Sequence, residues 1–336
     1  MYLKVISISI FLYLANLFNL SLAENINLYS ARQEVLMRPL IRAFEEKEGI
    51  RVNIISAKAN QLMDKIQKEG KYTKADILLT VDIARLLHAK SIGLFMAVNS
   101  NSLEKNIPAG LRDNQNFWFC ISKRARVFVY DKNRVLPSEL KGYIDLMENK
   151  WKSRILVRSS NNVYNQSLIA AMINNYGKER VNKFLYNFKN NFSRNPSGGD
   201  RDQIRAVLAG EGDIALVNSY YYFKMKKNDK NNKLKNLKIY FPHDKEMKTH
   251  INISGAGIIK YTKHYNNALK FLEFLISDKA QKIYAEKNFE YPIKNNIILN
   301  DFMSKYVIPK EDALDLNLIG NYNKEALFMM TRAGWR

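Results

Sequence analysis

Residues 26–56, INLYSARQEVLMRPLIRAFEEKEGIRVNIIS, contain a short apolar stretch at each end and a longer stretch between them. The two ends, 26–30 and 51–56, are typical of β-strands, and the middle, 34–49, is helix-like. A strand, a helix and a second strand in this order form the usual unit of a parallel sheet. The stretch therefore predicts an α/β fold.

The same alternation continues along the chain and predicts α/β domains with largely parallel sheets. Local signals add detail. Pro39 inside a helix-like stretch predicts a kink or a late helix start, Asp200 with Gln203 fits a capping box, and Gly210 fits a left-handed helix stop. The further strand-like stretches are 75–80, 118–122, 125–130, 155–159 and 213–218, and the further helix-like ones are 60–70, 166–177, 178–192 and 201–212.

The first 25 residues, MYLKVISISIFLYLANLFNLSLAEN, have the pattern of a secretory signal. One positive charge, Lys4, precedes an apolar stretch that ends in the small-residue sequence SLA, so we expect cleavage after Ala23. The alternative is an uncleaved membrane anchor. The single cysteine, Cys120, allows no intramolecular disulfide and places no lipid-bearing cysteine at the cleavage site. The expected location is the periplasm.

Size and charge limit the class of protein. A mature chain of about 313 residues suits two domains. The net charge of +21 would favour nucleic-acid binding in a cytoplasmic protein, but export argues against it and the basic residues are spread along the chain. The lysine-rich run 224–238 is interpreted as a solvated loop. We expect a monomer that binds no nucleic acid.

Polar side chains gather just after the predicted strands. Ligands of open α/β sheets bind beyond the carboxyl ends of the strands, so these side chains are the candidates for a binding site. The sequence has no histidine cluster, no Cys-x-x-C and no Ser/His/Asp ordering at these places. The residues are Arg32 and Gln33, Asp82, Ser159, Ser160 and Tyr164, and Tyr220 with Tyr221.

The adjacent tyrosines at 220 and 221 point to a metal ion. Phenolate oxygens are hard donors that suit a small, highly charged cation such as Fe(III). Zn(II) would recruit histidine or cysteine, and Ca(II) would recruit several carboxylates. The alternative is that some of these tyrosines, among 19 in the chain, only fill space in the core.

With these residues in view, the chain resembles the periplasmic ferric-ion-binding proteins of bacterial iron ABC transporters, the bacterial transferrin group. The resemblance covers nearly the whole mature chain. It rests on several segments in the same order: LYSARQEVLMRPLIRAFEEKEGIRV, ADILLTVDIARL, SKRARVFVYDKNRV, RSSNNVYNQSLIAAMI, GGDRDQIRAVLAGEGDIALVNSYYY, INISGAGI and RAGWR.

The family implies a fold and a mechanism. Two α/β lobes, joined by a two-strand hinge, close over the ion and later deliver it to an inner-membrane ABC permease. The lobes would comprise residues 24–126 with 251–301 and residues 127–250 with 302–336.

The resemblance also implies a ligand set of Tyr164, Tyr220 and Tyr221, with Tyr222 in a packing role. Many members have a histidine, or a histidine and a tyrosine, where this chain has Gln33 and Glu34, and some have a glutamate where it has Val81. The chain instead resembles the subgroup in which three tyrosines hold Fe(III) and a carbonate completes the coordination.

Arg32 and Gln33 would donate to that carbonate. Glu34 is kept as an alternative ligand. Tyr29 is expected to pack at a strand end, and Lys224 to lie beside the ligands as a cation. Asp82 and Arg124 are expected to hold the cleft or hinge by ion pairs.

Two other classes of function compete. The same fold could carry another small anion or cation, although a polyamine would require carboxylates that these strand ends lack. An exported enzyme would need a nucleophile with its base, or paired acids, and the sequence offers no convincing set. We therefore predict a binding protein and not an enzyme.

Overall fold

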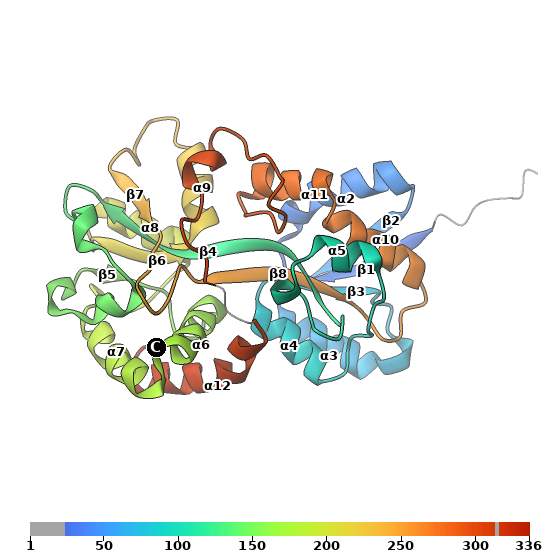
Figure 1. Cartoon of the computed structure of the whole chain (residues 1–336), viewed down its shortest axis with the longest axis horizontal. Coiled ribbons are helices and arrows are strands. Elements are labelled where there is room, and N and C mark those ends of the chain that lie inside the picture. The colour runs from blue at the N-terminus through green and yellow to red at the C-terminus, as the bar shows by residue number, and fades with distance from the viewer. Residues whose placement is uncertain (1–23, 313–315) are drawn as a thin grey trace, which may run out of the picture.

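The computed structural model describes residues 24–312 and 316–336, and the predicted signal segment lies outside them. The molecule has two halves, each built from strands covered by helices (Figure 1). We name them the β1–β3 half and the β5–β7 half, after the strands each contains. The two-lobed α/β fold expected from the sequence is confirmed.

The strands form one curled sheet in the order β2-β1-β3-β8-β4-β6-β5, with β7 also paired to β4. Pairing is parallel for β1 with β2 and β3, and for β5 with β6. It is antiparallel wherever β4 or β8 takes part. The bounds are β1 Asn25–Ser30, β2 Arg51–Ser56, β3 Ile77–Thr80, β4 Phe119–Asp131, β5 Ile155–Leu156, β6 Ile214–Asn218, β7 Leu237–Tyr240 and β8 Ile251–Ile258.

Strands β4 and β8 connect the two halves (Figure 1). The first part of β4, Phe119–Ala125, pairs with β8, and its second part pairs with β6 and β7. Strand β8 in turn pairs with β3. Strands β4 and β8 lie so close together at Gly255 of β8 that a Cβ on this residue would be 2.8 Å from the Phe119 carbonyl oxygen of β4. The sequence predicts largely parallel sheets, and this is wrong for the centre of the molecule because both connecting strands run antiparallel to their neighbours.

Helices cover the sheet in each half. Helix α12 packs on both α6 and α4, which lie in different halves (Figure 1). None of the helices within 24–312 and 316–336 is long and apolar enough to cross a membrane. The bounds are α2 Glu34–Glu48, α3 Ala59–Glu69, α4 Ile83–Ser91, α5 Asn101–Asn106, α6 Val163–Tyr176, α7 Lys178–Asn190, α8 Asp200–Ala209, α9 Ser219–Lys227, α10 Tyr265–Leu275, α11 Asp278–Ile283 and α12 Leu316–Arg332.

Helix ends test the local predictions. Gly210 ends α8 in the left-handed conformation, as expected. Asp200 does not cap that helix, however, and the carboxylate that accepts from the Gly199 N–H, at 2.7 Å, is Asp202. Helix α2 begins at Glu34 and includes Pro39, so a late start at this proline is wrong.

Candidate metal centre

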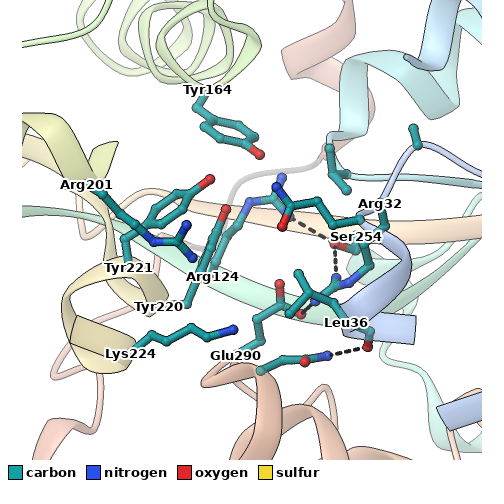
Figure 2. A pocket seen from close by; sticks show the side chains of 14 residues that line it. Arg32, Leu36, Arg124, Tyr164, Arg201, Tyr220, Tyr221, Lys224, Ser254 and Glu290 are labelled. Carbon is teal, nitrogen blue, oxygen red and sulfur yellow. Dashed lines mark hydrogen bonds and ion pairs between the residues drawn. The ribbon is translucent and has the colours of Figure 1, made fainter. Parts of the chain in front are cut away.

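A cavity of about 180 Å³ lies where the ends of β1, β3 and β6 meet the start of α6. Both halves contribute to it, because β1 and β3 belong to one half and α6 and α9 to the other (Figures 1 and 2). Its polar and charged lining is Arg32, Gln33, Arg124, Tyr164, Arg201, Tyr220, Tyr221, Lys224, Ser254, Asn288 and Glu290.

Tyr220 and Tyr221 lie in the first turn of α9, immediately after β6. Their ring centroids are 4.1 Å apart, and Figure 2 shows both phenols facing Tyr164 across the cavity. The next tyrosine points elsewhere, since the buried Tyr222 hydroxyl donates to the Leu237 carbonyl at 2.9 Å. The packing role expected for Tyr222 is confirmed.

Tyr164 comes from the first turn of α6, which begins three residues earlier than the sequence suggests. The Asn162 side chain caps this helix by accepting from the Tyr164 N–H at 3.2 Å. Two guanidinium groups pack on the phenol ring, Arg124 at 5.1 Å and Arg158 at 5.8 Å from its centroid. Cations over an aromatic face are attracted by its negative potential, and they would stabilise a phenolate further.

Burial sets the protonation state of the paired phenols. It raises the pKa of Tyr221 to about 12, with the neighbouring Tyr164 adding to the shift, and raises the pKa of Tyr220 well above the usual value. Ionising a phenol of pKa ~12 at pH 7 costs about 7 kcal/mol. Both groups are therefore protonated unless a strong cation replaces the protons.

Asp200 stabilises the turn from β6 into α9, the helix that carries Tyr220 and Tyr221. Its buried carboxylate accepts from the Asn218 N–H at 2.8 Å, where β6 turns into α9. It also pairs with Arg126 at 3.0 Å and with Arg158 at 3.3 Å. This explains why Asp200 does not cap α8, because its oxygens are already committed to other elements.

Arg32 lies at the end of β1 and is only 3 % exposed. Its Nη2 forms an ion pair with Glu290 at 2.8 Å, and its Nη1 donates to the Ser254 hydroxyl at 3.0 Å. Ser122 donates a further hydrogen bond to Glu290 at 2.7 Å. The charge of Arg32 is thus paired inside the protein, although its Nε has no hydrogen-bond partner among residues 24–312 and 316–336.

Arg124, in the middle of β4, is 2 % exposed. Its Nη1 donates to Ser254 at 3.2 Å. Within residues 24–312 and 316–336, its Nε and Nη2 have no hydrogen-bond partner and no carboxylate lies within ion-pair distance. A buried guanidinium with free donors is a binding group for an anion. The ion pair expected for Arg124 is not formed.

Two more cations line the side of the cavity formed by the β5–β7 half. The Arg201 guanidinium lies 5.3 Å from the Tyr221 ring centroid. Burial and the nearby positive charges of Arg201 and Arg32 lower the pKa of Lys224. Figure 2 shows the Arg201 side chain beside Tyr221 and the Lys224 side chain directed past Tyr220 towards Glu290.

Three of the predicted residues lie away from the cavity. Glu34 pairs with Arg38 on the surface of α2 at 2.5 Å. Tyr29 is 1 % exposed and packs in the core. Asp82 is buried at the start of α4, where hydrogen bonds and not an ion pair satisfy its carboxylate.

Sequence reasoning missed Arg201, Ser254, Asn288 and Glu290. Ser254 belongs to a segment noted for the resemblance, INISGAGI, but a serine in a strand has no distinguishing signal. Glu290 lies between Phe289 and Tyr291, and an acid flanked by buried aromatic residues is the one clue that singles it out.

The chemistry of the cavity is that of oxygen donors and cations. No group of three or more His, Cys, Asp or Glu side chains that could hold a metal occurs in the part of the chain that the structure describes. The oxygen donors that line the cavity are mainly phenols, and Fe(III) is the common ion with a preference for phenolate.

Comparisons with known proteins agree with this description. The model of the bacterial extracellular solute-binding protein family matches residues 72–314. Iron uptake protein A1 of Synechocystis is 40% identical over 93% of this chain and 88% of its own length.

Two solved structures are similar over their full length. One is the Trichodesmium protein IdiA (FutA) in complex with iron and citrate, at 41% identity, with a TM-score of 0.87 and coverage of 93% of this chain and 100% of that one. The other is ferric iron-binding protein A of Mannheimia haemolytica in an open conformation, at 40% identity, with a TM-score of 0.85 and coverage of 93% and 99%. The chain belongs to the bacterial extracellular solute-binding protein family.

Proposed function

We propose that this protein captures Fe(III) in the periplasm and delivers it to an inner-membrane ABC permease, without catalysing a reaction. The observation that carries the proposal is the convergence of Tyr164, Tyr220 and Tyr221 on one cavity that both halves line. Relatives similar over nearly the whole chain are an iron uptake protein and a ferric iron-binding protein. Export with cleavage after Ala23, and action as a monomer, are part of the proposal.

The three phenols would act as phenolate ligands. Each would give up a proton to the solvent, and the trivalent ion would offset the cost of ionisation, which is increased for Tyr220 and Tyr221 because burial raises their pKa. A divalent ion has less charge with which to offset that cost. The same argument makes acid a releasing agent, because protons compete with the ion for all three oxygens.

The lobes would be residues 24–126 with 251–301 and residues 127–250 with 302–336. Strands β4 and β8, which run through both halves, would be the hinge. Closure brings Arg32 and Gln33 from one lobe towards the three tyrosines of the other.

A carbonate would complete the coordination, with Arg32 and Gln33 as donors and Arg124 as a third. Three phenolates neutralise Fe(III), so a carbonate leaves a charge of about −2 to be balanced. Glu290 already neutralises Arg32. Arg124, whose guanidinium has free donors, is therefore one of the cations that would balance the carbonate. Lys224 and Arg201, which line the same cavity, would be the others.

Glu34 remains the alternative ligand, and the same fold with another small ion remains the alternative function. The surplus of cations around the cavity favours an anion as that second cargo. Protonated phenols could also donate hydrogen bonds to an anion, but relatives that are an iron uptake protein and a ferric iron-binding protein make iron the first candidate.

The carbonate assignment predicts that iron binding depends on bicarbonate. In bicarbonate-free buffer the wild-type protein should bind Fe(III) at least about tenfold more weakly than with bicarbonate added, since one charge-assisted contact is worth about 1.5–3 kcal/mol. Iron titration against a competing chelator measures the difference. Arg124→Gln should show a smaller bicarbonate effect than wild type.

Glu34→Gln is the control for the alternative ligand and should bind like wild type. Equal affinity with and without bicarbonate, together with loss of binding in Glu34→Gln, would show that Glu34 takes the place assigned to carbonate. Binding of a small anion with no binding of iron at all would replace the proposed cargo.

A further inference from the structure

A buried carboxylate, next in sequence to the cavity-lining Val81, joins three elements of the molecule. Asp82 is the residue before α4 and is fully buried. It accepts hydrogen bonds from the Ser167 hydroxyl at 3.0 and 2.8 Å and from the Asn252 side-chain amide at 2.6 Å. Its third donor is the Ala84 N–H, at 2.9 Å.

The three elements lie in different parts of the fold. Helix α4 belongs to the β1–β3 half and α6, which carries Ser167, to the β5–β7 half (Figure 1). Asn252 lies on β8, one of the two connecting strands, and its side-chain oxygen accepts from the Ile83 N–H at 3.3 Å. Asp82 therefore bonds across the division between the halves.

Ser167 has a direct connection to the cavity. It follows Tyr164 by three residues on α6, so the two lie about one helical turn apart on the same side of the helix. A bond that fixes Ser167 to the β1–β3 half also fixes the first turn of α6. Tyr164 projects into the cavity from that turn.

Capping of α4 does not by itself explain the network. The bond from the Ala84 N–H already meets the usual requirement of an N-cap aspartate. The hydroxyl of Ser167 adds contacts from the opposite half, and Ser167 has no exposed surface. Separating the halves would break these contacts and leave a buried carboxylate with fewer donors, which is costly.

We infer that Asp82 and Ser167 are positioning residues that fasten α6, and with it Tyr164, to the β1–β3 half and so keep the cleft closed around its cargo. The inference rests on the proposed function of the cavity. Asp82 and Ser167 would thus raise the affinity for Fe(III) and slow its release, although neither residue touches the ion. The solved Mannheimia relative with an open conformation is an example of the state that this pair would oppose.

The test is Ser167→Ala, which removes the hydroxyl and leaves Asp82 with two of its three donor groups. Release of Fe(III) to an excess of chelator should become about tenfold faster, the factor that one hydrogen bond to a charged group represents. Association should change little. Small-angle scattering of the iron-free protein should show a larger radius of gyration than for wild type.

Ser100→Ala is the matched control. Ser100 is also a buried serine whose hydroxyl donates to a carboxylate, that of Glu273, at 2.6 Å. Both residues, however, lie in the β1–β3 half. Its release rate and scattering should equal those of wild type. A Ser167→Ala variant that releases iron at the wild-type rate, or no faster than Ser100→Ala, would overturn the inference.

The proposed function can fail separately. If the wild-type protein binds no iron, the cargo assignment is wrong, and scattering of the iron-free chains then decides the role of Ser167. A more extended Ser167→Ala profile supports the positioning role. Identical profiles for wild type and Ser167→Ala would refute it.

Discussion

Replacing Tyr220 or Tyr221 with phenylalanine should weaken Fe(III) binding by more than about 100-fold while the chain still folds. Loss of a partner outside the ligand set typically costs 10–100-fold in metal affinity, so loss of a direct ligand should cost more. Each substitution removes one oxygen and keeps the ring. The packing of the two rings, with centroids 4.1 Å apart, is therefore retained. Iron titration with a competing chelator gives the affinity, and circular dichroism checks the fold.

Tyr222→Phe is the matched control, because it makes the same change at the next residue. Its hydroxyl donates to the Leu237 carbonyl and not into the cavity. The variant should lose about 1 kcal/mol of stability and bind iron like wild type. Wild-type affinity in both Tyr220→Phe and Tyr221→Phe would remove these two residues from the ligand set.

The second large effect concerns the stability of the iron-free protein. Arg32→Met should lower the free energy of unfolding by about 3–5 kcal/mol, because it leaves the buried Glu290 without its counter-charge. The double variant Arg32→Met/Glu290→Met should regain most of this loss, since replacing both members of a buried ion pair is often close to neutral. Urea denaturation of the three iron-free proteins measures the differences.

This prediction affects how the anion site should be studied. A single substitution of Arg32 would change the fold and the cavity together, whereas Arg124 has no carboxylate partner among the described residues to be left unpaired. If Arg32→Met is as stable as wild type, the Arg32–Glu290 pair does not balance charge in the folded protein. The free charge facing the anion would then include Arg32.

The α/β class and the tyrosine pair could be predicted because both depend on local sequence. Alternating strand-like and helix-like stretches are read within windows of about ten residues. Tyr220 and Tyr221 follow a strand-like stretch directly, and α9 begins there. Tyr164 also follows a strand-like stretch, and the resemblance to a known family then distinguished it as a ligand from the serines before it.

The connecting strands and the charge balance could not be predicted from local sequence. Strand β4 pairs with β8 more than 120 residues away, and its direction is decided by that pairing and not by its own residues. Glu290 and Arg32 are 258 positions apart in the sequence and meet only in the folded chain. Asp200 looks like a helix cap in the sequence, but its carboxylate instead forms ion pairs with Arg126 and Arg158, which are distant in the sequence.

The central claim is that phenolate oxygens of this cavity hold Fe(III), and visible spectroscopy during an iron titration tests it most directly. Phenolate bound to Fe(III) absorbs visible light by charge transfer. The account predicts an orange to red colour that grows to one iron per chain, fades as protons displace the metal in acid, and is weakened in Tyr220→Phe and Tyr221→Phe. A protein that binds one iron tightly and stays colourless would contradict the account, because its ligands would not be tyrosines.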